Sequence, residues 1–311
     1  MIDPRRFARG ASIDSTALEE VTVRRLKSQI TDKDFRRRRV EVLPYEPSGD
    51  EERAYAELDS LLRSSGRAQG RRNLDIAALL LKKRFLSSPW AFAQTLEGYL
   101  APALPTGNAD WLDGDGDDAY DDYYTEVMGS GQSDEEEGLI AQPELDTLLA
   151  TRGSDPLSAA TREQLEDLAQ WARGYQSRPD SRLEALVSML DAVCRPDGRT
   201  WTNERVVVFT EYADTLDWIV SVLRQQGYGE RLAVIRGSTY AEEREDIRAR
   251  FNAHPTEEDV RVLVATDAAG EGIDLQTYCH RLVNFDVPFN PSRLEQRVGR
   301  IDRYGQRETP T

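Results

Sequence analysis

Three arginines near the C-terminal end have the residue type and spacing for phosphate chemistry. They are Arg297, Arg300 and Arg303, within the stretch QRVGRIDRYGQ that begins at Gln296. A guanidinium binds phosphate through two parallel hydrogen bonds, which a lysine ammonium cannot reproduce. On a helix, Gln296, Arg300 and Arg303 share one face. The opposite face is aliphatic and consists of Leu294, Val298 and Ile301. The pattern alone is equally typical of an amphipathic helix whose arginines are merely solvated.

A second stretch, LVATDAAGEGIDLQ, precedes the arginines and ends at Gln276. Its glycines, Gly270 among them, would let backbone N–H groups approach a phosphate closely. Asp267, Glu271 and Asp274 could accept hydrogen bonds from sugar hydroxyls or hold an arginine from the next helix. The Gly-Glu-Gly triplet is a weak signal alone, because it lacks the GxGxxG spacing of dinucleotide sites.

The C-terminal half alternates short apolar runs with helical patterns. The predicted strands are Arg205–Thr210, Arg231–Ile235, Val260–Thr266 and Arg281–Val287. Asn290-Pro291 predicts the start of the arginine helix, with a capping residue followed by proline. This alternation predicts an α/β fold, a parallel sheet with helices on both faces. Ligands of such sheets lie beyond the carboxyl ends of the strands, where the sequence places Thr210, Gly237-Ser238, Thr266-Asp267 and Asp286.

The N-terminal half is mainly helical, and the sequence divides into five parts. We expect an inter-lobe connector at 1–40, a helical insertion at 41–106, an acidic disordered linker at 107–138, a helical segment at 139–180 and the sheet domain at 181–311. Val40–Pro47 could form a short strand, Ser88-Pro89 predicts a helix start, and Thr161–Gln164 fits a capping box.

The segment 107–138 contains twelve acidic residues and neither lysine nor arginine, so it accounts for most of the net charge of −16. Asp113, Asp115 and Asp117 match the first ligands of a calcium-binding EF-hand loop. However, Asp118 stands where that loop needs glycine, and Tyr124 where it needs glutamate. A solvated acidic linker is the better interpretation.

The rest of the composition excludes several classes of protein. Two cysteines are too few for a disulfide scaffold, and the two histidines have no metal-ligand spacing, so no metal site is expected. The sequence has no signal peptide and no apolar run of about 18 residues, so we expect a cytoplasmic protein without membrane contact. No GxxxxGK[ST] phosphate loop or Walker B strand occurs. The arginines therefore resemble one half of a composite site.

Four stretches in order resemble the second RecA-like lobe of superfamily 2 helicase-type ATPases, specifically the SNF2/HepA type. VVVFTEYADTLDWI is similar to motif IV, GSTYAEEREDIRARF to the segment after it, VLVATDAAGEGIDLQ to motif V and QRVGRIDRYGQ to motif VI. VRRLKSQI resembles the segment that leaves the first lobe in SNF2 proteins. The resemblance covers Arg205–Gln306. It also suggests a bacterial ATPase of this type, in phage defence or bound to RNA polymerase.

The resemblance implies a DNA-dependent ATPase that moves along duplex DNA without sequence preference. Arg300 and Arg303 would be arginine fingers for ATP and Mg²⁺ held mainly by a first lobe, in the same or another chain. The implied nucleotide and coupling residues are Gly270, Glu271, Asp274, Gln296 and Arg297. The implied contacts to the nucleic-acid backbone are Thr210, Ser238, Arg244 and Thr266.

The sequence lacks the first lobe and stops at Thr311, before the strand expected after motif VI. We therefore expect this polypeptide alone to be inactive. One alternative is a non-catalytic module on a RecA-like scaffold that binds a protein partner through residues 31–180. Another is a free-standing nucleotide-binding enzyme, against which the missing phosphate loop counts.

Overall fold

The computed structural model describes residues 36–69, 73–101, 158–267, 273–288 and 290–311. Four strands form one sheet: β1 (Val206–Thr210), β2 (Leu232–Ile235), β3 (Val262–Thr266) and β4 (Arg281–Asn284). Their order is β2-β3-β1-β4 and every neighbouring pair is parallel. The predicted parallel sheet is confirmed. The acidic linker expected at 107–138 and most of the connector expected at 1–40 lie outside the described residues.

Alternate side chains of each strand pack against helices on opposite faces of the sheet. On one face, Val206 and Val208 pack with α8 (Ser181–Cys194) and α9 (Ala213–Leu223). On the other face, Val207 and Phe209 pack with Ile247 and Phe251 of α10 (Ala241–Asn252). This alternation follows from the two-residue period of a strand, and it confirms the expected helices on both faces.

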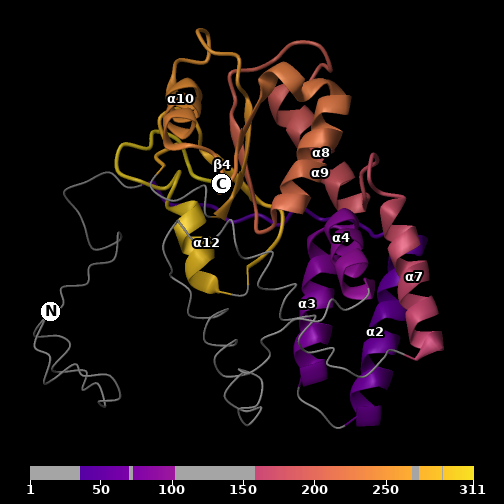
Figure 1. The fold of residues 1–311 in the computed structure, drawn as a ribbon. Coiled ribbons are helices and arrows are strands. Elements are labelled where there is room, and N and C mark those ends of the chain that lie inside the picture. The colour runs from indigo at the N-terminus through magenta and orange to yellow at the C-terminus, as the bar shows by residue number, and fades with distance from the viewer. Residues whose placement is uncertain (1–35, 70–72, 102–157, 268–272, 289) are drawn as a thin grey trace, which may run out of the picture.

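A second core lies beside the sheet, as Figure 1 shows. Its helices are α2 (Gly49–Gln69), α3 (Asn73–Ser87), α4 (Pro89–Leu100) and α7 (Ala159–Arg173). We call these four helices the helical region. Leu58, Leu80, Phe92, Leu96 and Leu165 are buried together in this core, so the segments before and after the acidic stretch pack as one unit. In contrast, Leu183 of α8 packs with the sheet. The boundary at residue 181 stays a prediction.

Two predicted helix starts have different outcomes. Ser88 is the N-cap of α4, since its hydroxyl accepts a hydrogen bond from the N–H of Ala91 at 3.0 Å, as predicted. The capping box predicted at Thr161–Gln164 is wrong. Ser158 caps α7 instead and accepts from the N–H of Thr161 at 3.1 Å, so the helix begins three residues earlier.

The stretch before α2 crosses the molecule in an extended form, in indigo in Figure 1. Val40–Pro47 contains no strand, because Pro44 and Pro47 lack an N–H donor and the segment has no sheet partner among the described residues. Arg38 instead forms two hydrogen bonds with Glu295, at 2.8 and 2.7 Å. Within the described ranges, no helix is both long and apolar enough to cross a bilayer.

Candidate functional site at the carboxyl ends of the strands

The arginine helix, α12 (Pro291–Val298), differs from its predicted form in length and in anchoring. Asn290 caps it and Pro291 opens it, as predicted, but the helix ends at Val298. Arg300 and Arg303 therefore lie on the turns that follow. Arg297 is the buried residue of α12, whereas Leu294 and Val298 are only partly buried. A guanidinium, rather than an aliphatic face, anchors this helix.

Arg297 sits among acids at the carboxyl ends of β3 and β4, with only 2% of its side chain exposed. It donates two hydrogen bonds to Asp267, one of them from Nη2 to Oδ2 at 2.8 Å. Its Nη1 donates to the backbone oxygen of Asp286 at 2.8 Å and to Asn284 Oδ1 at 3.1 Å. Burial disfavours the charge, but the hydrogen bonds and proximity to Asp267 outweigh burial and raise the pKa of Arg297.

Asp286 collects donors from three parts of the chain. Its Oδ2 accepts from the hydroxyl of Thr210 at 2.6 Å and from the hydroxyl of Ser87, in α3, at 2.9 Å. Its Oδ1 accepts from the N–H of Glu211 at 2.8 Å and lies 3.5 Å from Nη2 of Arg297. The carboxylate is 8% exposed and has four partners, which is how a buried charge is stabilised.

Glu211 is a second acid shared between elements. Its Oε1 accepts from Lys83 Nζ of α3 at 2.8 Å and lies 3.6 Å from Arg293 Nη1 of α12. Arg293 also lies 3.9 Å from Asp267. Sequence reasoning missed Glu211, Arg293 and Lys83 as parts of the site. Only the position of Glu211, directly after a strand-end threonine, could have indicated it.

The two arginines that follow α12 lie beside the loop after β3. Arg303 forms an ion pair with Asp274, and its Nε donates to the oxygen of Gly299 at 2.7 Å. The carbonyl of Arg300 accepts from the N–H of Leu275 at 3.0 Å. Both side chains are partly exposed. These contacts agree with the expectation that acids of the earlier stretch could hold arginines of the later one.

The turn that ends this segment depends on glycine and on a buried amide. Gly305 has a φ of 93°, a conformation that side chains with a Cβ rarely adopt. Gln306 is buried, and its Nε2 donates to the oxygens of Cys279 and Ile301 at 2.9 and 3.0 Å. Tyr304, Gly305 and Gln306 end the stretch QRVGRIDRYGQ, and the contacts of Gln306 hold the arginine turns against the domain.

The remaining predicted site residues have different surroundings. Thr210 is fully buried against Asp286, Thr266 is 7% exposed, and Ser238 is exposed at the end of β2. Arg244 donates to the oxygens of Gly237 and Thr239, at 2.7 and 2.9 Å, and so holds the loop that carries Ser238. Gln296 is exposed on α12, and Gly270 and Glu271 lie outside the described residues.

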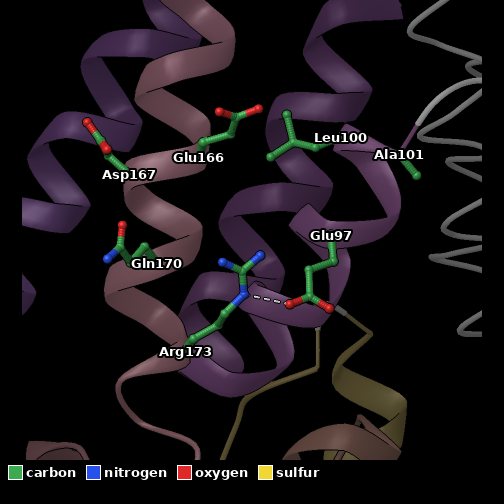
Figure 2. A pocket seen from close by; sticks show the side chains of 7 residues that line it. All are labelled: Glu97, Leu100, Ala101, Glu166, Asp167, Gln170 and Arg173. Atoms are coloured by element: carbon green, nitrogen blue, oxygen red, sulfur yellow. Dashed lines mark hydrogen bonds and ion pairs between the residues drawn. The ribbon is translucent and has the colours of Figure 1, made fainter.

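A pocket lies between α4 and α7 of the helical region (Figure 2). Its polar lining includes Glu97, Glu166, Asp167, Gln170 and Arg173. Arg173 donates to Glu97 at 2.6 Å, and Glu166 pairs with Arg162 at 2.9 Å. The first pair joins α7 to α4 and the second lies within α7, and the pocket shares no residue with the strand-end site.

The strand-end site lies inside a recognisable domain. Residues 182–305 match the model of the helicase conserved C-terminal domain, and this range includes all four strands and α12. This part of the chain is therefore a helicase C-terminal domain.

Two bacterial proteins are similar to part of this chain. YqhH of Bacillus subtilis, an uncharacterized ATP-dependent helicase, is 38% identical over 104 residues, which are 33% of this chain and 17% of that protein. The RNA polymerase-associated protein RapA of Proteus mirabilis is 37% identical over 127 residues, 41% of this chain and 12% of the relative. Over these segments the chain is similar to one protein named as an ATP-dependent helicase and to one named as an RNA polymerase-associated protein.

One solved structure that the chain matches is the C-terminal part of the Fun30 ATPase domain. It matches 89% of this chain and 84% of its own, with 17% identity and a TM-score of 0.48. The aligned segments cover less than a fifth of the length of YqhH and RapA.

Proposed function

We propose that this chain is the second motor lobe of an ATP-dependent DNA translocase. In this proposal, Arg300 and Arg303 reach the phosphates of an ATP molecule held by a preceding lobe. The observation that carries it is the anchoring of Arg297 by Asp267 and Asp286, which holds the arginine turns at the strand ends of a helicase C-terminal domain. Preorganised guanidiniums at that edge suit the charge that develops on a transferred phosphoryl group.

The described residues fit only the phosphate end of the nucleotide. Arg300 and Arg303 are partly exposed and could turn toward phosphate oxygens, while Arg297 is committed to the protein. Asp267 and Asp286 are occupied by arginine and hydroxyl donors, and the described residues contain no group of three or more potential metal ligands. ATP with its Mg²⁺ is therefore assigned mainly to the preceding lobe, and Gln296, Glu271 and Asp274 to the edge that meets it.

The nucleic-acid contacts in the proposal are graded by exposure. Ser238 is the direct backbone contact, because it is exposed at the end of β2. Arg244 shapes the loop that presents it, and Thr266 lies at the neighbouring strand end. Thr210 acts indirectly through Asp286, since its hydroxyl is buried. Backbone contacts of this kind bind duplex DNA without reading its sequence.

Complementation with a separate first lobe tests the proposal. The purified chain is mixed with a polypeptide that carries the preceding lobe, and ATP hydrolysis is measured with and without duplex DNA. We expect negligible hydrolysis by either polypeptide alone and DNA-stimulated hydrolysis by the mixture. Robust magnesium-dependent hydrolysis by this chain alone would contradict the composite site.

A protein partner is a separate, second candidate. The helical region lies outside residues 182–305 and has a core of its own, so it could bind a protein without the motor. RapA carries RNA polymerase association in its name, and we extend that only as a proposal. Capture of purified RNA polymerase by the chain, unaffected by ATP, would favour this candidate.

A further inference from the structure

The helical region contacts the same two acids that hold the arginine helix. The C-terminal part of α3 supplies Lys83 to Glu211 and Ser87 to Asp286. From the other side, α12 supplies Arg293 to Glu211 and Arg297 to Asp286. The two elements are far apart in sequence and both contact the acids that follow β1 and β4.

This junction is buried and well packed. The hydroxyls of Ser87 and Ser88 lie 2.7 and 2.8 Å from the hydroxyl of Thr215, and all three residues are buried. Arg84 stacks over the ring of Tyr212, with its guanidinium carbon 3.8 Å from the centroid. Lys83 and Glu211 are 9% and 10% exposed, so water screens their ion pair only weakly.

The arginine helix is unusually dependent on these charges for its position. Arg297 is the only one of its eight residues that is buried, and its neighbours along the helix are partly or fully exposed. Apolar packing resumes only at Ile301, after the helix has ended. The position of α12, and with it the placement of Arg300 and Arg303, therefore depends on ion pairs. The buried pairs are to Asp267, Glu211 and Asp286, and an exposed pair joins Glu295 to Arg38.

We propose that Lys83 and Ser87 are positioning residues that fix the arginine turns through Glu211 and Asp286. The helical region then acts as a support for the arginine segment, rather than as an independent appendage. Its effect on ATP hydrolysis rests on the proposed function, but its effect on α12 does not.

Amide hydrogen exchange in the purified chain tests the inference directly. In Lys83→Met, we expect exchange at residues 291–303 to accelerate by about tenfold, as for the loss of one hydrogen bond to a charged group. Ser87→Ala should accelerate the same amides. Lys83→Arg keeps the charge and should restore most of the protection. The amides of α2 and α7 should be unchanged.

Lys82→Met is the matched control. Lys82 is the neighbouring residue on α3, but its ammonium pairs with Asp59 at 2.5 Å, within the helical region. This variant should leave exchange at residues 291–303 at the wild-type rate. Equal acceleration in Lys82→Met and Lys83→Met, or none in Lys83→Met, would overturn the inference. Failure of the lobe mixture to hydrolyse ATP would count against the proposed function alone, because exchange is measured without ATP.

Discussion

Replacing Arg297 by methionine should destabilise the domain more than any exposed arginine replacement. Methionine keeps much of the apolar stem but removes four hydrogen bonds, to Asp267, Asn284 and the backbone of Asp286. Two carboxylates, 9% and 8% exposed, then lose the countercharge of Arg297, although Asp267 keeps a second cation nearby, Arg293 at 3.9 Å. Breaking a buried ion pair from one side costs about 3–5 kcal/mol.

Urea unfolding followed by circular dichroism measures this cost. With a slope of roughly 2 kcal/mol per molar urea, the midpoint should fall by about 1.5–2.5 M. Arg250→Met is the control, because its Nε lies 3.4 Å from Glu258 and its side chain is 45% exposed. Surface pairs contribute about 0–1 kcal/mol, so that midpoint should move by no more than about 0.5 M. Equal shifts in the two variants would refute the assignment of Arg297 as the anchor.

Charge, rather than lost packing, should explain the effect of Arg297→Met. Without the guanidinium, the carboxylates of Asp267 and Asp286 stay buried after losing the nearest cation. Adding Asp267→Asn removes one of these buried charges and should recover part of the lost stability. Simple additivity of the two changes in the double variant would point to packing alone.

Four further outcomes are expected. Hydrogen bonds from Ser48, and also from Trp171 and Tyr175, lower the pKa of Asp50 to about 2. The contribution of ionised Asp50 to the stability of the fold should be complete above about pH 4 and disappear toward pH 2. The stability gap between wild type and Asp50→Asn in urea titrations should close over that window. Burial raises the pKa of Cys194 and Cys279 to about 12, so at pH 8 a thiol reagent should modify both only as fast as the domain opens. In the two-lobe mixture, Arg300→Ala should lower kcat by about 10³-fold, and near-normal turnover would remove it from the finger role. Gly305→Ala should cost about 1 kcal/mol in urea unfolding, because its φ of 93° strains any residue with a Cβ.

The sheet was predictable from the sequence because the pattern that indicates each strand lies in consecutive residues. Within the run Arg205–Thr210, residues 206–209 are all apolar, as a strand covered on both faces requires, and β1 begins one residue later than predicted and ends at Thr210. The strand expected over Arg281–Val287 ended at Asn284 instead. Beyond the strand, the carboxylate of Asp286 accepts hydrogen bonds from Thr210 and Ser87, which lie 76 and 199 residues away in the sequence. No local pattern contains that information.

The arginine helix shows why the candidate site was only half predictable. Helical periodicity placed the aliphatic residues inside and the arginines outside, because it assumes that charge seeks water. In the structure Arg297 is buried, because Asp267 and Asp286 at the strand ends pair with its guanidinium. The strand-end acids were recognised in the sequence, but their pairing with particular arginines depends on how β3, β4 and α12 meet in space. Periodicity along one element cannot give that pairing.

The pairing of strand-end acids with cations of the chain also suits the proposed composite site, in which Arg300 and Arg303 take part. Acids at the carboxyl ends of a parallel sheet would ordinarily be available to a metal or a nucleotide hydroxyl. Here Asp267, Asp286 and Glu211 are each bound to cations of the chain itself. They hold the backbone of α12 in place and leave the turns that carry Arg300 and Arg303 partly exposed. In the proposed composite site, the domain would contribute positive charge at this position, and the preceding lobe would supply the metal ligands.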